Sequence, residues 1–204
     1  MSTISHIPRL PQFKRPPVAV RRFTVDEYHQ MGVGGVLTSD DQVELLEGWI
    51  VPKMIHNPQH ALAIENGQVA LQRSLPKEWR LRVQLPITTD DSEPEPDFAV
   101  VRQKRPRRLE THPTADDLAL VIEVADSTLE QDRRLKGTLY ARAGIPAYWI
   151  VNLIDRHVET FSQPTGAAAA PTYTVRKKFP RGKKVPLVID GKTVAEISVA
   201  DLLP

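Results

Sequence analysis

The segment "VIEVADSTLEQDRRLKGTLYARAGIPAYWIV", residues 121–151, decides the fold of this chain. It begins and ends with apolar runs of strand length, and the stretch between them has the apolar spacing of a helix. The first run extends back to residue 118 as "LALVIEVA", a pattern typical of a central strand that is covered on both faces. Such a segment suits a protein core, yet it carries Glu123, Asp132 and Lys136.

Further helices and strands are predicted on both sides of this segment. Its own helix is expected to begin at Ser127 or Thr128, with Glu130 completing a capping pair, and to end at Gly144 and Pro146. The other expected elements are a helix after Thr24, a helix from Pro58, and strands at 42–51, 80–88, 96–101, 147–151, 157–162, 172–179 and 185–189. This order favours an α/β fold with a mixed central sheet flanked by helices, and with additional C-terminal strands.

Length and composition favour a soluble globular protein. The 204 residues suit one domain, expected at 22–204, after a flexible proline-rich arm at 1–21. No apolar run approaches the roughly 18 residues that a membrane helix needs. The absence of cysteine excludes disulfides, thiolate zinc sites and cysteine nucleophiles, and it fits a reducing compartment, with the cytoplasm as the default location.

Two charges of the predicted helix point inward. On a helical wheel of about 100° per residue, Asp132 and Lys136 fall within the apolar arc of Leu129, Leu135 and Leu139. A buried charge needs a partner, because leaving it isolated costs several kcal/mol. Asp132 and Lys136 are spaced i, i+4, so a purely structural ion pair between them would account for both.

Two further acids lie at strand ends. Glu123 shares a strand face with Val121, near the C-terminal end of its strand, where sites tend to form in open α/β sheets. Asp97 follows Pro96 at the start of another apolar strand, and it could simply cap the turn there. The two acids and the inward lysine together form a more specific set than any one of them.

This set resembles the motif of the PD-(D/E)XK nuclease superfamily, which has the restriction-endonuclease-like fold, with the lysine displaced onto the following helix. More narrowly, "VELLEGWIV", "PEPDFAVV", "LVIEVADSTLEQDRRLK" and "LYARAGIPAYWIV" resemble the Uma-two family of predicted endonucleases, over about residues 22–204. Two departures stand out: Ala125 occupies the usual lysine position, and Ala147 and Asn152 stand where relatives usually carry acids.

The resemblance implies a metal-dependent endonuclease that hydrolyses the phosphodiester bonds of DNA. Asp97 and Glu123 would bind Mg²⁺ or Mn²⁺, since hard cations prefer oxygen ligands. The ion would activate water and polarise the phosphoryl group, and Lys136 would stabilise charge or orient the attacking water. A homodimer is expected, because restriction-like nucleases commonly pair to cut two strands.

Five more residues are candidates for supporting roles: Glu44, His60, Gln84, Asp132 and Tyr140. His60 lies on an apolar helical arc and could equally be a core histidine. Glu44 matches an early glutamate that many superfamily members place near the metal. Gln84 could reach the site or merely end its strand, and Tyr140 could bind a phosphate or pack in the core.

Positive charge is concentrated in two clusters, "RQKRPRR" at 102–108 and "VRKKFPRGKK" at 175–184. Basic clusters supply sequence-independent affinity for phosphates, although an isolated one is usually a solvated surface. The expected nucleic-acid contacts are Arg102, Lys104, Arg105, Arg107, Arg108, Lys177 and Lys178.

The main rival hypothesis is a nucleic-acid-binding or assembly module that keeps the nuclease fold without cleaving. A serine hydrolase is disfavoured because the chain has no "GxSxG" motif. It also lacks the "GxxxxGK" and "GxGxxG" loops of nucleotide and dinucleotide sites.

Overall fold

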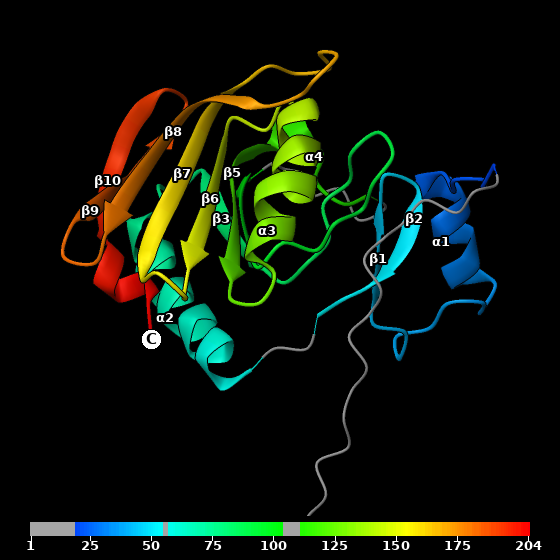
Figure 1. Cartoon of the computed structure of the whole chain (residues 1–204), viewed down its shortest axis with the longest axis horizontal. Coiled ribbons are helices and arrows are strands. Elements are labelled where there is room, and N and C mark those ends of the chain that lie inside the picture. Colours follow the sequence, from blue (N-terminus) through cyan, green and yellow to red (C-terminus); the bar gives the residue numbers. More distant parts are fainter. Residues whose placement is uncertain (1–18, 55–56, 104–110) are drawn as a thin grey trace, which may run out of the picture.

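A six-stranded mixed sheet forms the centre of the computed structural model, which describes residues 19–54, 57–103 and 111–204. The sheet order is β3-β4-β5-β6-β7-β8, with β5 and β6 parallel and every other neighbouring pair antiparallel (Figure 1). The strands are β3 (Trp79–Val83), β4 (Phe98–Arg102), β5 (Leu118–Ala125), β6 (Ala147–Asn152), β7 (His157–Pro164) and β8 (Tyr173–Pro180). The predicted mixed α/β fold is confirmed.

The crossover from β5 to β6 covers one face of this sheet (Figure 1). It is a nearly continuous helix made of α3 (Leu129–Gln131), the π-helical turn η2 (Asp132–Lys136) and α4 (Gly137–Arg142). All eight residues of β5 are buried, as its apolar run predicts. A short 3₁₀ turn, η1 (Ala115–Asp117), leads into this strand.

The other face of the sheet packs against α2 (Pro58–Ser74) and the C-terminal elements β9 (Lys184–Ile189), β10 (Lys192–Ser198) and η3 (Val199–Leu202). The helix α2 begins at the predicted Pro58, after the N-cap Asn57. It approaches the sheet closely at Gly67, where an added Cβ would lie 2.8 Å from the Phe98 ring. Two apolar cores therefore enclose the central strands.

A separate hairpin and a short helix lie beside the sheet (Figure 1). The helix α1 (Val25–Val33) is capped by Thr24, as expected, and the hairpin consists of β1 (Val43–Leu46) and β2 (Trp49–Pro52). Both residues of the connecting turn, Glu47 and Gly48, have positive φ angles, 49° and 77°. This turn geometry matches the twist of the two flanking strands. The prediction of one strand at 42–51 was therefore wrong, because the chain reverses direction at this turn.

Two other predictions about the secondary structure need correction, and one strand was not predicted. The strand expected at 80–88 ends at Val83, because Gln84 has a φ of 50° and leaves the extended conformation. The helix after β5 has Thr128 at its N-cap, but the Thr128 side chain does not cap the backbone. The strand β10 was not predicted.

Within the described part of the chain, no helix is both long and apolar enough to cross a membrane.

Candidate active site

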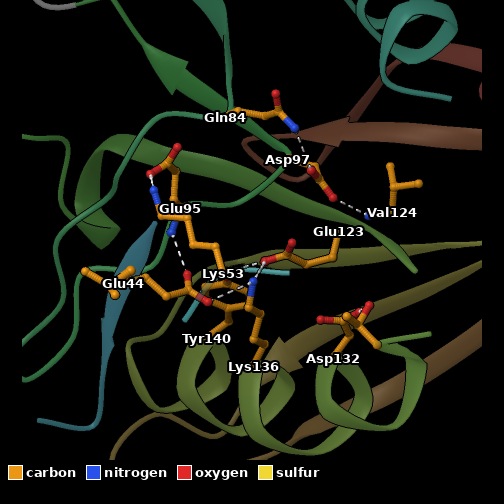
Figure 2. A network of polar contacts seen from close by, with 12 residues as sticks. Glu44, Lys53, Gln84, Glu95, Asp97, Glu123, Val124, Asp132, Lys136 and Tyr140 are labelled. Carbon is orange, nitrogen blue, oxygen red and sulfur yellow. Dashed lines mark hydrogen bonds and ion pairs between the residues drawn. The ribbon is translucent and has the colours of Figure 1, made fainter. Parts of the chain in front are cut away.

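Four buried acidic residues converge on one pocket of about 500 Å³. They are Glu44, Asp97, Glu123 and Asp132. The pocket lies where β4 begins and β5 ends, between the hairpin β1–β2 and the start of α2. The amine of Lys136 projects into the same group from the crossover helix (Figure 2). Residues far apart in sequence thus form one charged site.

Asp97 is held by three donors at the start of β4. The backbone N–H of Val124 donates to its Oδ2 at 2.8 Å, and the Gln84 amide donates to its Oδ1 at 3.3 Å (Figure 2). His60 Nε2 lies 3.2 Å from Oδ2. Burial alone would raise the pKa of Asp97. The contact with His60 and the hydrogen bond from the Val124 N–H together outweigh burial, so the pKa of Asp97 is lowered. Asp97 is therefore a stable carboxylate beside the strand that carries Glu123.

Glu123 is buried near the C-terminal end of β5 and has two donors on the crossover helix. Lys136 Nζ lies 3.0 Å from Glu123 Oε1, and the Tyr140 hydroxyl donates to the same oxygen at 2.6 Å (Figure 2). Burial raises the pKa of Glu123 to about 8, against the opposing effect of Lys136. A second cation at this carboxylate would favour its ionised form.

Lys136 lies between two carboxylates. Besides its contact with Glu123, its Nζ is 3.7 Å from Oε1 of Glu44. Burial by itself would lower the pKa of Lys136, but the negative charges of Glu123 and Glu44 raise it above its usual value. The lysine therefore stays protonated and supplies a fixed positive charge to the pocket.

The π-helical turn sets the directions of Asp132 and Lys136. The N–H of Gly137 reaches back to the carbonyl of Asp132, five residues earlier, and the Tyr148 hydroxyl donates to that carbonyl at 3.1 Å. Such wide turns occur frequently at functional sites. Both side chains are buried, as the helical wheel predicts.

The i, i+4 ion pair between Asp132 and Lys136 does not form. In a regular helix the i, i+4 spacing would bring the two side chains together, but the wide turn alters this spacing. Asp132 instead accepts a hydrogen bond of 2.6 Å from Thr128, and Lys136 pairs with Glu123 and Glu44. Burial raises the pKa of Asp132 to about 6.

The hairpin β1–β2 contributes one wall of the pocket. Glu44 Oε2 accepts a hydrogen bond of 3.0 Å from the backbone N–H of Glu95, and the Glu95 side chain forms an ion pair with Lys53. Lys53 and Glu95 line the pocket, but sequence reasoning missed them. The position of Glu95, two residues before Asp97 in "EPEPD", was the available signal.

The five supporting candidates all lie in this region. Gln84 and His60 contact Asp97, Tyr140 contacts Glu123, Glu44 contacts Lys136, and Asp132 lines the pocket. Tyr140 is completely buried, so its hydroxyl orients Glu123 and is not open to a ligand.

The predicted nucleic-acid contacts are more scattered. Arg102 lies at the opposite end of β4 from Asp97, where it binds Asp190 at 2.7 Å and covers the Trp79 ring. This position does not favour contact with a nucleic acid bound at the pocket. Lys177 and Lys178 are exposed on the edge strand β8. The remaining four, Lys104, Arg105, Arg107 and Arg108, lie outside the described residues.

The donor set suits a hard divalent cation that keeps part of its water shell. Across residues 19–54, 57–103 and 111–204, no three His, Asp or Glu side chains are grouped as a complete metal site. Mg²⁺ does not require one, because it is usually bound by one or two carboxylates and several waters. Two of the buried carboxyl groups, Glu123 and Asp132, have raised pKa values. A bound cation would lower both pKa values, because it favours the ionised carboxylates.

The fold is similar to that of a crystal structure described as "a putative nuclease belonging to DUF820" from Anabaena variabilis ATCC 29413. The TM-score is 0.67 at 18% sequence identity, and the similarity covers 88% of this chain and 97% of that chain. The two proteins thus share one fold.

The family follows from the sequence. The profile of the Uma2 family, described as "Putative restriction endonuclease", matches residues 25–191. The chain belongs to this family, as its motifs indicated. A search of curated proteins found no match.

Proposed function

We propose that this chain is a metal-dependent endonuclease that hydrolyses phosphodiester bonds of DNA. The observation that carries the proposal is the convergence of Asp97, Glu123 and Lys136 on one pocket, from two adjacent strands and the crossover helix. Membership of a family described as restriction endonucleases supports a nucleic-acid substrate.

Asp97 and Glu123 are the proposed ligands of Mg²⁺ or Mn²⁺. When bound, such an ion would supply Lewis-acid activation of the phosphate and of the attacking water. Asp97 is ready for this role because its pKa is lowered, and Gln84 and Val124 fix its two oxygens. Glu123 is directed toward the pocket by Tyr140.

Lys136 is proposed to stabilise negative charge on the phosphate. Its ammonium is held close to Glu123 and Glu44, so its charge is already in place before the substrate binds. Preorganised charge of this kind is often the largest contribution to catalysis. Asp132 and Glu44 complete an acidic pocket that would keep a cation near Asp97 and Glu123.

The test compares cleavage by the wild-type protein with that of Asp97→Asn and Glu123→Gln. We expect the wild type to cut plasmid or oligonucleotide DNA with Mg²⁺ or Mn²⁺ and to be inactive with a chelator. Each substitution should reduce cleavage at least about 100-fold, as removal of one key charge-stabilising group does in other enzymes. DNA binding should remain.

The matched controls are Asp201→Asn and Glu196→Gln, which change exposed acids on the C-terminal elements. They should cleave like the wild type. If the wild type binds DNA but shows no metal-dependent cleavage, the non-catalytic binding module becomes the better description. The expected homodimer and cytoplasmic location stay predictions, and light scattering in solution would check the first.

A further inference from the structure

A second charged cluster lies next to the pocket, centred on Glu159 of β7. Glu159 is 0% exposed, and it contacts two guanidinium groups, those of Arg133 and Arg176, and the ring of His157. Arg133 comes from the crossover helix and Arg176 from the edge strand β8. The cluster therefore joins three separate elements through one buried carboxylate.

The sheet register places this cluster on the same face as the pocket. Glu123 pairs with Ile150, Ile150 pairs with Glu159, and Glu159 pairs with Lys178. Directly paired residues of neighbouring strands point to the same face. Two strand spacings of about 4.8 Å put Glu159 roughly 10 Å from Glu123.

The crossover helix connects the two regions directly. Asp132 lines the pocket, and the next residue, Arg133, binds Glu159. A separation of roughly 10 Å corresponds to about three nucleotides along one strand of a B-form duplex, at 3.4 Å each. A nucleic acid that ran from the pocket toward β8 would meet the exposed side chain of Arg176.

The two arginines of the cluster have more hydrogen-bond donors than its carboxylates use. Glu159 faces both guanidinium groups, and Arg133 also pairs with the exposed Glu130 at 3.1 Å, so the positive charge of Arg176 is the less compensated of the two. Arg176 is 46% exposed along its side chain and covers the Phe161 ring at 5.2 Å. A guanidinium has five N–H groups, and the bond from Arg176 to Glu159 uses one. The exposed side of Arg176 therefore has donors directed toward solvent.

We propose that Arg133 and Arg176 form a phosphate-binding subsite for the nucleic-acid backbone next to the cleavage pocket, with Glu159 as the positioning residue that holds both guanidinium groups. This inference rests on the proposed nucleic-acid substrate. Arginine suits the task because its planar fork of donors matches phosphate oxygens.

The experiment measures binding of a fluorescently labelled DNA oligonucleotide by anisotropy, with a chelator present and salt varied from low to high. Each phosphate contact contributes about 0.7 to 0.9 to the slope of log affinity against log salt. We expect Arg133→Gln and Arg176→Gln to lower the affinity and to reduce this slope by about that amount each.

The matched control is Arg142→Gln. Arg142 also pairs with two acids, Glu47 and Asp91, but it lies at the far end of the crossover helix. This variant should keep the wild-type affinity and slope. Equal slopes for the wild type, Arg133→Gln and Arg176→Gln would overturn the proposal and leave a purely structural ion cluster.

Glu159→Gln gives a second, independent readout. The substitution removes one negative charge, so general electrostatics alone would tighten DNA binding. Loss of the positioning residue should weaken binding instead, and Glu159→Asp should restore part of it. Tighter binding by Glu159→Gln would contradict the positioning role.

Because these measurements need no metal, they separate this inference from the proposed function. Cleavage by the wild type with unchanged binding by Arg176→Gln would reject the subsite alone. Binding that depends on Arg176, without any cleavage, would support the subsite and reject the nuclease activity.

Discussion

The ammonium of Lys136 lies 3.0 Å from the Glu123 carboxylate, although the two residues are thirteen positions apart and on different elements. Glu123 is also a proposed metal ligand, so Lys136 and a divalent cation would both be attracted to the same acid. The lysine is thus expected to oppose metal binding even as it assists the reaction.

Replacing Lys136 with methionine should separate these two effects. Removing a nearby positive charge should tighten Mn²⁺ binding on the order of tenfold, since about 1.4 kcal/mol gives that factor. Cleavage by Lys136→Met should nevertheless fall. Calorimetric titration with Mn²⁺ measures the first effect and an oligonucleotide assay the second. Weaker Mn²⁺ binding by the variant would show that Lys136 does not compete with the ion.

The Tyr140 hydroxyl should matter for the rate more than for substrate binding. Tyr140→Phe keeps the buried ring but removes the donor to Glu123, which costs about 1 kcal/mol of stability. We expect kcat to fall roughly tenfold, because about 1.4 kcal/mol of lost transition-state stabilisation gives that factor. KM for DNA should change little. An increase in KM alone would assign Tyr140 to substrate binding.

The stability of the folded protein at low pH should depend on the ion pairs of Glu159. Burial would raise the pKa of Glu159, but its contacts with Arg133, His157 and Arg176 lower it from 4.5 to about 2. The unfolded chain therefore binds the proton more readily, and this stabilisation is present above about pH 4.5 and lost as the pH falls toward 2. Urea denaturation across this range should show a smaller loss for Glu159→Gln. An unchanged pH profile would contradict the lowered pKa.

The close packing of α2 on β4 predicts that Gly67→Ala destabilises the fold. Alanine in a helix usually gains about 1 kcal/mol over glycine. Here its Cβ would lie 2.8 Å from the Phe98 ring, and crowding of this kind typically costs about 1–3 kcal/mol. We expect a lower melting temperature, measured by circular dichroism. Gly32→Ala, in α1 with open space around the added Cβ, should not lower it.

The sequence predicted the centre of the fold because burial there is recorded in the spacing of apolar residues. The run at 118–125 and the inward arc that includes Asp132 and Lys136 both depend only on local periodicity. Glu123 and Asp97 could be placed at strand ends for the same reason. That these two acids and Lys136 form one site was implied by the family resemblance.

Other features depend on contacts that local spacing does not record. The strand β10 was missed because Ile197 is its one buried residue, so it shows no clear alternation. The turn at 47–48 interrupts an apolar stretch with two residues, which is compatible with either a strand or a hairpin. The bond from Glu95 to Glu44, and the row from Glu123 to Glu159, follow from strand pairing across long sequence separations.

The wide turn at Asp132–Lys136 has a consequence for how this site tolerates change in chain length. A π-helical turn holds one residue more than a regular turn, so deleting a single residue there would relax it into an ordinary helix. The segments on either side would keep their orientation, because the wide turn had absorbed the extra residue, and the shift would fall on the side chains within the turn, Asp132 and Lys136 among them. Such a deletion could remove Lys136 from Glu123 while retaining every acid, amine and hydroxyl of the site. Insertions and deletions in this turn are therefore expected to be more damaging than most single substitutions there.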